Sequence, residues 1–494
     1  MAKLFREGVR KTVMLLMVLM LFMFVSGCSD DAAPDVDSDV DVDAAQEEIN
    51  WDFYNNLATE FITAWASGDY TAAAAMFSDE MAQGFGVDGL MGVWSDIAAL
   101  VGEYVEIHDI ENYAADDLYL AIVITRHEEF GFGWRVVFSE EGIIVGLFTE
   151  GTIPLSQLRA DNSGTNEVVQ RDGFRDHFVT LGESTGFPLN AVISMPDGIV
   201  EPVPAVVIVH GSGAHDMDGT LFGNTPYRDI AEFLAMNGIA VIRHDKRNFT
   251  HGVRLSVEYA DSFTVWQEVI EDAILAAELL RADPLIDENR VFMIGHSLGG
   301  TLAPRIHLLG GNFAGLILMA ATPRNLLDVF VEQITASAYA GLEEGLIDEA
   351  EKAEALAQIA ELAELFDSIA DMSPEEARET PIPVPASSAY YWQDMLIHSF
   401  ADFAENVTAP ILVMQGGSDF QVLPDVDFVL LQEIFAGHSD VTFKLYDGLN
   451  HMFMHTTAMN FVQHAESMQT QGYIDTQVLH DIADWIRLHY GEEQ

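Results

Sequence analysis

The segment Val291–Leu302, "VFMIGHSLGGTL", decides how the rest of the chain is interpreted. An apolar run typical of a buried strand leads into the glycine-flanked turn "GHSLG", and the residues after it can continue as a helix. In one interpretation, the small residues only permit a tight turn. In the other, the two glycines leave Ser297 clear of the backbone, so that its hydroxyl can act as a nucleophile. The pattern of the flanking sequence distinguishes these interpretations.

From residue 170 to residue 494 the pattern alternates between strands and helices. Buried strands are expected at "PAVVIVHGSG", "IAVIRHDKR", "RVFMIGH", "FAGLILMAA", "APILVMQGGSD" and "VTFKLYDGLNH". This alternation predicts an α/β fold with a mostly parallel central sheet and helices on both faces. The segments "FRDHFVTLGE" and "FPLNAVISMP" predict an antiparallel opening pair. Between residues 322 and 403 a stretch rich in Ala, Leu and Glu predicts an inserted helical cap over the sheet.

In this context "GHSLG" resembles the nucleophile elbow of the α/β-hydrolase superfamily. In that family an acid and then a histidine follow the serine along the chain. Asp419 comes just after the strand "ILVMQ", and His451 lies in the loop after the last expected strand. The resemblance implies that Ser297 is the nucleophile, that His451 is its general base and that Asp419 orients the histidine.

Several other residues compete for these roles. The rivals for the acid are Asp425, Asp427 and Asp447, and the rival for the base is His455. Asp425 and Asp427 are expected to open a helix after Pro424, where acidic residues suit the helix dipole. His455 is expected in a helical continuation one turn beyond His451. Asp419 and His451 are therefore preferred.

The stretch "HGSG" at residues 210–213 resembles the oxyanion loop of the same family. By that resemblance the backbone N–H groups of Ser212 and Leu298 form the oxyanion hole, with Gly213 as an alternative first donor. His210 and His215 have no further ligand spacing that would support a metal site, so neither a metal nor a cofactor is expected. The basic patch "RHDKR", residues 243–247, is interpreted as internal ion pairing below the site, with anion binding as the alternative.

The first 28 residues have the architecture of an export signal. Basic residues precede the apolar run "TVMLLMVLMLFMFV", and "VSGC" at residues 25–28 resembles the lipobox of bacterial lipoproteins. The resemblance implies that Cys28 is acylated and that the protein is an extracytoplasmic, membrane-anchored bacterial lipoprotein. The alternative is an ordinary secretory signal with an incidental cysteine. Residues 29–46 are acidic and low in complexity, so an extended disordered tether is expected.

Residues 47–150 are expected to form a separate α+β accessory domain. An apolar helical face comes first, and four strand-like runs separated by turn signals follow it. This order resembles the small cone-like domain of the nuclear transport factor 2-like superfamily. Trp94, His108 and Trp134 offer a ligand pocket there, although packing in the core is the preferred interpretation. A polar linker is expected at residues 151–169.

Composition narrows the classes of function. The formal net charge of −57 repels phosphate backbones, so nucleic-acid binding is not expected. Cys28 is the single cysteine, which excludes an internal disulfide bond. The sequence therefore predicts a serine hydrolase that cleaves esters of small or medium acyl groups through an acyl-enzyme. The alternatives are a peptidase or amidase that uses the same triad, and a binding lipoprotein with a vestigial hydrolase domain.

Three adjacent aromatic residues near the end of the cap are candidates for the substrate pocket. They are Tyr390, Tyr391 and Trp392. One face of a helix cannot bury all three, so at least one is expected to face a cleft and to line the acyl pocket. The alternative is that they anchor the cap to the sheet. The oligomeric state is left open by the sequence.

Overall fold

The computed structural model describes residues 49–115, 118–155, 167–221, 223–259, 261–382, 388–468 and 470–490. The expectations for the signal, for Cys28, for the tether and for most of the linker lie outside these residues. The described residues form two compact units, one before and one after residues 156–166.

The N-terminal unit consists of helices followed by an antiparallel sheet. Its elements are α2 (Trp51–Ala66), α3 (Tyr70–Ala74), α4 (Asp79–Gly84), α5 (Gly86–Val101), β1 (Tyr104–Ala115), β2 (Leu118–His127), β3 (Phe130–Phe138) and β4 (Ile144–Pro154), with strand order β1-β2-β3-β4. Trp94 and Trp134 lie in its core with stacked rings 6.0 Å apart, whereas His108 is exposed on β1. The core interpretation is confirmed for the two tryptophans and is wrong for His108, whose side chain is exposed on strand β1.

The C-terminal unit is built on one nine-stranded sheet. Its strands are β5 (Val168–Gln170), β6 (Phe174–Leu181), β7 (Leu189–Pro196), β8 (Val203–Val209), β9 (Ala240–His244), β10 (Ile286–His296), β11 (Leu316–Met319), β12 (Ile411–Gly416) and β13 (Val441–Tyr446). The order across the sheet is β13-β12-β11-β10-β8-β9-β7-β6-β5. The strands from β13 to β9 in this order are parallel, and β7, β6 and β5 add to them in antiparallel fashion. The predicted parallel sheet with an antiparallel opening pair is confirmed.

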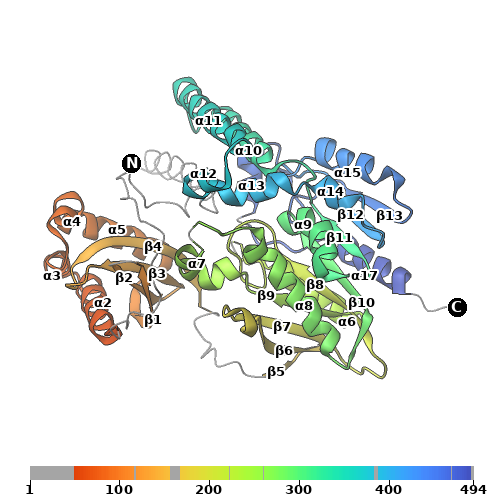
Figure 1. Ribbon diagram of the computed structural model, residues 1–494, viewed down its shortest axis with the longest axis horizontal. Coiled ribbons are helices and arrows are strands. Elements are labelled where there is room, and N and C mark those ends of the chain that lie inside the picture. Colours follow the sequence, from red (N-terminus) through yellow and green to blue (C-terminus); the bar gives the residue numbers. More distant parts are fainter. Residues whose placement is uncertain are drawn as a thin grey trace. The chain divides into compact units, whose positions relative to one another are not determined.

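Helices cover both faces of this sheet (Figure 1). On one face, α6 (Pro226–Met236) and α17 (Thr476–Tyr490) pack against inward residues such as Ile208. On the other, α8 (Glu271–Ala282) and α9 (Leu298–Ile306) pack against the alternate residues. Side chains of a strand alternate between the two faces, so both faces of the central strands must be apolar. This is why the central strands appear in the sequence as continuous apolar runs.

The helices inserted between β11 and β12 interrupt the alternation, as the sequence predicts. They are α10 (Leu326–Glu343), α11 (Glu349–Ile369), α12 (Pro374–Glu379), α13 (Ala389–Ile397) and α14 (Phe400–Ala404). The first four gather at one end of this unit (Figure 1) and share a small core of their own around Phe366 and Ile369. Helix α14 packs instead into the core beneath α9 through Phe400 and Ala404. Among the described residues, no helix is long and apolar enough to cross a membrane.

Candidate active site

Ser297 lies at the junction of β10 and α9. The strand ends at His296 and the helix begins at Leu298, which leaves Ser297 alone in the turn. Its φ of 53° and ψ of −117° are rare for a residue with a side chain, and such strain persists only where the surroundings enforce it. The Ser297 N–H donates to the carbonyl oxygen of Met319 on β11 at 2.8 Å. The turn is thus fixed to the neighbouring strand, as in a nucleophile elbow.

The glycines on either side of Ser297 are required by close backbone packing. A Cβ on Gly295 would lie 2.3 Å from the carbonyl oxygen of Gly299. A Cβ on Gly299 would lie 2.4 Å from the carbonyl oxygen of Val209, at the end of β8. Neither contact is sterically allowed, so only glycine fits at either position. The missing side chain of Gly299 allows the serine turn to pack against the end of β8, and that of Gly295 allows the first turn of α9 to pack against the end of β10.

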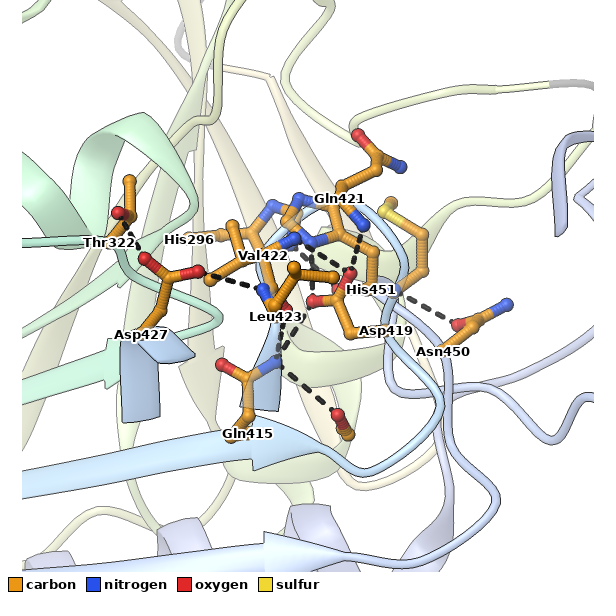
Figure 2. Close-up of polar contacts among 12 residues, drawn as sticks. His296, Thr322, Gln415, Asp419, Gln421, Val422, Leu423, Asp427, Asn450 and His451 are labelled. Atoms are coloured by element: carbon orange, nitrogen blue, oxygen red, sulfur yellow. Dashed lines mark hydrogen bonds and ion pairs between the residues drawn. The ribbon is translucent and has the colours of Figure 1, made fainter. Parts of the chain in front are cut away.

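Asp419 and His451 form a buried pair close to this turn (Figure 2). The Nδ1 atom of His451 lies 2.8 Å from Oδ2 of Asp419, and the two residues are 4% and 3% exposed. Oδ1 of Asp419 accepts the backbone N–H groups of Gln421 and Val422, and Oδ2 also accepts Nε2 of Gln415 at 3.0 Å. The carboxylate therefore holds the proton of the imidazole on Nδ1 and leaves Nε2 free to act as a base.

The environment keeps Asp419 ionised. Burial raises the pKa of its carboxyl, but the charge of His451 and the hydrogen bonds from His451 and from two backbone N–H groups lower it more. The resulting pKa lies below the ordinary value for an aspartate. Asp419 thus carries the negative charge that an imidazolium at residue 451 needs.

His296 connects His451 to the elbow. Its Nε2 lies 3.0 Å from the carbonyl oxygen of His451, and the two rings are 4.8 Å apart. The loop that carries Asp419 and the loop that carries His451 also pack closely. Gly416, at the end of β12, permits this, because a Cβ at that position would lie 2.5 Å from the carbonyl oxygen of Asn450. His296 directly precedes Ser297, so the structure brings His451 beside the serine turn. This role of His296 cannot be predicted from the sequence, because the middle position of "GHS" alone does not reveal it.

The rival residues have other surroundings. Asp427 is fully buried, and its carboxylate accepts from the Thr322 hydroxyl at 2.6 Å and from the backbone N–H of Leu423 (Figure 2). It also accepts from the Arg324 guanidinium at 2.7 and 2.9 Å. The remaining rivals Asp425, Asp447 and His455 are exposed. His455 pairs with Asp475 at 2.7 Å. The helix expected to contain His455 is wrong, because the chain turns there and α16 (Phe461–Ser467) begins later.

The loop after β8 lies directly against the serine. A Cβ on Gly211 would be 3.2 Å from Cβ of Ser297. The next residue, Ser212, is exposed, and its carbonyl oxygen lies 2.7 Å from Nε2 of His215. Leu298 is the first residue of α9, so its N–H has no acceptor within the helix. The two backbone donors expected for an oxyanion hole therefore belong to segments that meet at Ser297.

The "RHDKR" patch forms buried ion pairs. Nε of Arg243 lies 2.7 Å from a carboxylate oxygen of Asp218, and Arg247 pairs with Asp272. Lys246 lies 2.6 Å from Glu268 and is 2% exposed. The expected internal ion pairing is confirmed. Among the described residues, no group of three or more His, Cys, Asp or Glu side chains is arranged to hold a metal ion.

The three cap aromatics differ in their surroundings. Tyr391 is 3% exposed, its hydroxyl donates to Glu268 at 2.6 Å and its ring stacks on Phe263. Tyr390 packs in the cap under the guanidinium of Arg378. Trp392 is half-buried between the cap core and the core beneath α9. The contacts of Tyr391 favour the anchoring alternative and those of Tyr390 lie within the cap, while a role of Trp392 in the acyl pocket stays a prediction.

Comparisons with known proteins cover both units. Residues 206–463 match the model of the "Alpha/beta hydrolase family", and residues 58–147 match a "Protein of unknown function (DUF3887)" family. The chain is 27% identical over 439 residues to Esterase EstD of Thermotoga maritima, which covers 88% of this chain and 95% of that protein.

Solved structures similar to the chain include both esterases and a peptidase. Est1E from Butyrivibrio proteoclasticus is 15% identical with a TM-score of 0.39, and the match covers 62% of this chain and 99% of that one. The proline iminopeptidase of Mycobacterium smegmatis is 18% identical with a TM-score of 0.40, and the match covers 63% and 98%.

Proposed function

The chain belongs to the α/β-hydrolase family, and we propose that it is a serine hydrolase that cleaves carboxylic esters of small or medium acyl groups through an acyl-enzyme. The observation that carries this proposal is the buried pair of Asp419 and His451, with Nδ1 and Oδ2 2.8 Å apart, held beside the strained turn of Ser297. The similarity to Esterase EstD along most of both chains supports esters as the substrate class.

The proposed reaction follows from the arrangement of these groups. Ser297 Oγ attacks the ester carbonyl carbon while Nε2 of His451 takes the hydroxyl proton. The N–H groups of Ser212 and Leu298 stabilise the oxyanion, and His451 then gives its proton to the departing alkoxide. Water then attacks the acyl carbon while Nε2 of His451 takes its proton, and His451 returns this proton to Ser297 Oγ as the acid is released. Asp419 stays ionised throughout and stabilises the imidazolium, which its lowered pKa permits.

The test compares wild type with Ser297→Ala and with the control Ser368→Ala, at an exposed position of α11. The substrates are nitrophenyl esters of increasing acyl length and peptide anilides. Ser297→Ala should lose turnover by roughly four orders of magnitude or more, and a fluorophosphonate should label Ser297 in wild type only. Retained turnover in Ser297→Ala would contradict the proposal. Higher kcat/KM for the anilides would favour the peptidase alternative.

The proposed acyl pocket is tested on the same panel. Trp392→Ala should shift the preferred acyl length, because Trp392 packs between the cap core and the sheet-side core, and the loss of this packing should also lower the melting temperature. A lower melting temperature with an unaltered chain-length profile would show that Trp392 is structural.

We also propose that the protein is a membrane-anchored bacterial lipoprotein. The support is the basic and apolar leader that ends in "VSGC". Cys28→Ser should release the hydrolase from the membrane fraction of the producing cell without lowering its specific activity. A variant that stays fully membrane-bound would contradict the proposed lipid attachment.

A further inference from the structure

Lys246 has an unusual position for a lysine in this protein. The sequence contains five lysines, and burial of a lysine ammonium is costly unless it is paired. Lys246 is nevertheless 2% exposed, whereas the side chains of Lys352 and Lys444 are 17% and 44% exposed. The residue follows β9 and precedes α7 (Arg247–Glu258), outside the segments that carry the Ser297, Asp419 and His451 side chains.

The ammonium of Lys246 contacts two acceptors of different kinds. Nζ lies 2.6 Å from Oε1 of Glu268, and it donates to the carbonyl oxygen of Gly211 at 2.9 Å. The other carboxylate oxygen of Glu268 accepts the hydroxyl of Tyr391 at 2.6 Å. A buried chain of hydrogen bonds therefore runs from helix α13 of the cap through Glu268 and Lys246 to Gly211, in the loop that lies against Ser297.

The bond to Gly211 bears directly on the oxyanion hole. The carbonyl of Gly211 and the N–H of Ser212 belong to the same peptide group, which is planar and trans, so the two point in opposite directions. A donor that fixes the carbonyl oxygen therefore fixes the direction of the N–H. A cationic donor on the carbonyl also polarises the peptide and makes the N–H a stronger donor.

The N–H of Gly211 is fixed by a second chain. It donates to the hydroxyl of Tyr227 at 3.2 Å, and this hydroxyl lies 3.0 Å from Nδ1 of His296. Nε2 of His296 faces the carbonyl oxygen of His451, an acceptor, so Nε2 carries the ring proton and Nδ1 accepts from Tyr227. The peptide groups on both sides of Gly211 are therefore held by the buried side chains of Lys246 and Tyr227, and His296 links the Tyr227 hydroxyl to the backbone of His451.

From this geometry we propose that Lys246 is a positioning residue of the active site, which aims and polarises the Ser212 N–H toward the oxyanion, and that Glu268 and Tyr391 hold its ammonium in place. The inference rests on the proposed function, because it takes Ser212 as an oxyanion donor. Lys246 itself touches no reacting atom.

The test uses Lys246→Met in the full chain, because methionine keeps a long unbranched side chain without the ammonium. An oxyanion donor acts in the transition state, and loss of a whole donor costs about 10²–10³ in kcat. A misdirected donor should therefore lower kcat by about 10- to 100-fold and leave KM within about threefold. Lys444→Met, at a half-exposed lysine of β13, is the control and should leave both constants unchanged.

A double variant separates positioning from stability. Lys246→Met leaves the buried carboxylate of Glu268 without its cation and is expected to lower the melting temperature. Lys246→Met/Glu268→Gln removes both charges and should regain melting temperature while kcat stays low. If the single variant does not fold, the double variant alone carries the test. A double variant that regains full kcat together with its stability would overturn the proposal, because Lys246 would then be purely structural.

Fluorophosphonate labelling distinguishes this failure from that of the proposed function. If Ser297 is labelled in wild type and kcat is unchanged in the Lys246 variants, only the inference on Lys246 is wrong. If Ser297 is not labelled and Ser297→Ala keeps its turnover, the proposed function is wrong and this inference is wrong with it. Inhibition by a trifluoromethyl ketone directly measures how well the oxyanion hole binds its ligand. Ser297 adds to the ketone, and the resulting anionic oxygen occupies the hole. The inhibition constant of the ketone should rise in parallel with the loss of kcat.

Discussion

Two buried carboxylates of one segment, Asp419 and Asp427, have partners of different chemistry. Asp419 faces the imidazole of His451, which can gain and lose a proton. Asp427 faces the guanidinium of Arg324, which stays protonated, and the hydroxyl of Thr322. In the first pair, Asp419 supports His451 as it takes up and releases a proton at Nε2. The second pair joins the start of the cap to the segment after β12.

Substitution of these residues should separate turnover from stability. Asp419→Asn removes the charge behind His451 and should lower kcat by roughly four orders of magnitude with the fold retained. Asp427→Asn leaves Arg324 incompletely paired and should lower the free energy of unfolding by about 3–5 kcal/mol, with kcat of the folded molecules near wild type. Urea unfolding and steady-state kinetics on both variants measure the two effects. Loss of turnover in Asp427→Asn but not in Asp419→Asn would contradict the assignment.

The sequence could predict some of these residues and not others. Ser297, Asp419 and His451 stand at positions that a local pattern marks, since each follows an expected strand in the order of the hydrolase family. The partners of Lys246 lie 22, 35 and, through Glu268, 145 residues away along the chain. No local pattern relates residues so far apart, so only the folded structure reveals this chain of bonds.

At the scale of elements, the junction of β10 and α9 is the most tightly constrained part of the site. A side chain on Gly295 would collide with backbone atoms of the turn itself, and one on Gly299 would collide with backbone atoms at the end of β8. These atoms cannot move without disturbing the sheet. The elbow could be predicted from the sequence for this steric reason, because only glycine fits at the two positions. The helices of the cap could be predicted from their composition. The helix expected at His455 does not form, because the side chain of Asn450 accepts the N–H groups of Met452 and Met454 in a turn.

A glycine pair tests this steric argument. Gly295→Ala places a methyl group 2.3 Å from the carbonyl oxygen of Gly299 and should lower the free energy of unfolding by more than about 2 kcal/mol. Gly437→Ala is the matched control, since nothing lies within 4 Å of its Cβ position and its φ is not positive. It should change stability by less than about 1 kcal/mol. Equal stability of the two variants in urea unfolding would show that the turn tolerates a side chain.

At the scale of the whole molecule, the C-terminal unit contains several histidines that burial keeps neutral. Burial lowers the pKa of His244 to about 4, that of His296 to about 3 and that of His464 to about 4, and it lowers that of His210 well below the ordinary value. In the unfolded chain these groups titrate near 6.5. The pKa shift of Asp245 has the opposite effect on the pH dependence of stability, because burial raises its pKa to about 7.

These shifts predict that the enzyme loses stability in mild acid. Between pH 6.5 and 4 the unfolded state binds more protons at the histidines than the native state, so their contribution is complete above 6.5 and is lost as the pH falls. Four such groups change the free energy of unfolding by up to about 5 kcal/mol per pH unit, and Asp245 together with Asp272, whose pKa burial raises to about 6, offsets about two of them. Calorimetry between pH 7 and pH 5 should show a falling melting temperature. A melting temperature that is flat or rises over this range would contradict the prediction.

The hydrogen bond between Tyr391 and Glu268 has a consequence for attempts to change the substrate range by exchanging caps. A transplanted cap inserted between β11 and β12 replaces the partner of Glu268 along with the proposed walls of the acyl pocket. Unless the donor sequence presents a hydroxyl at the place of Tyr391, a chimaera would acquire its new selectivity together with a slower chemical step. Grafts that keep α13 from the recipient and exchange only α10 to α12 avoid this penalty, and they define the segment that is free to vary.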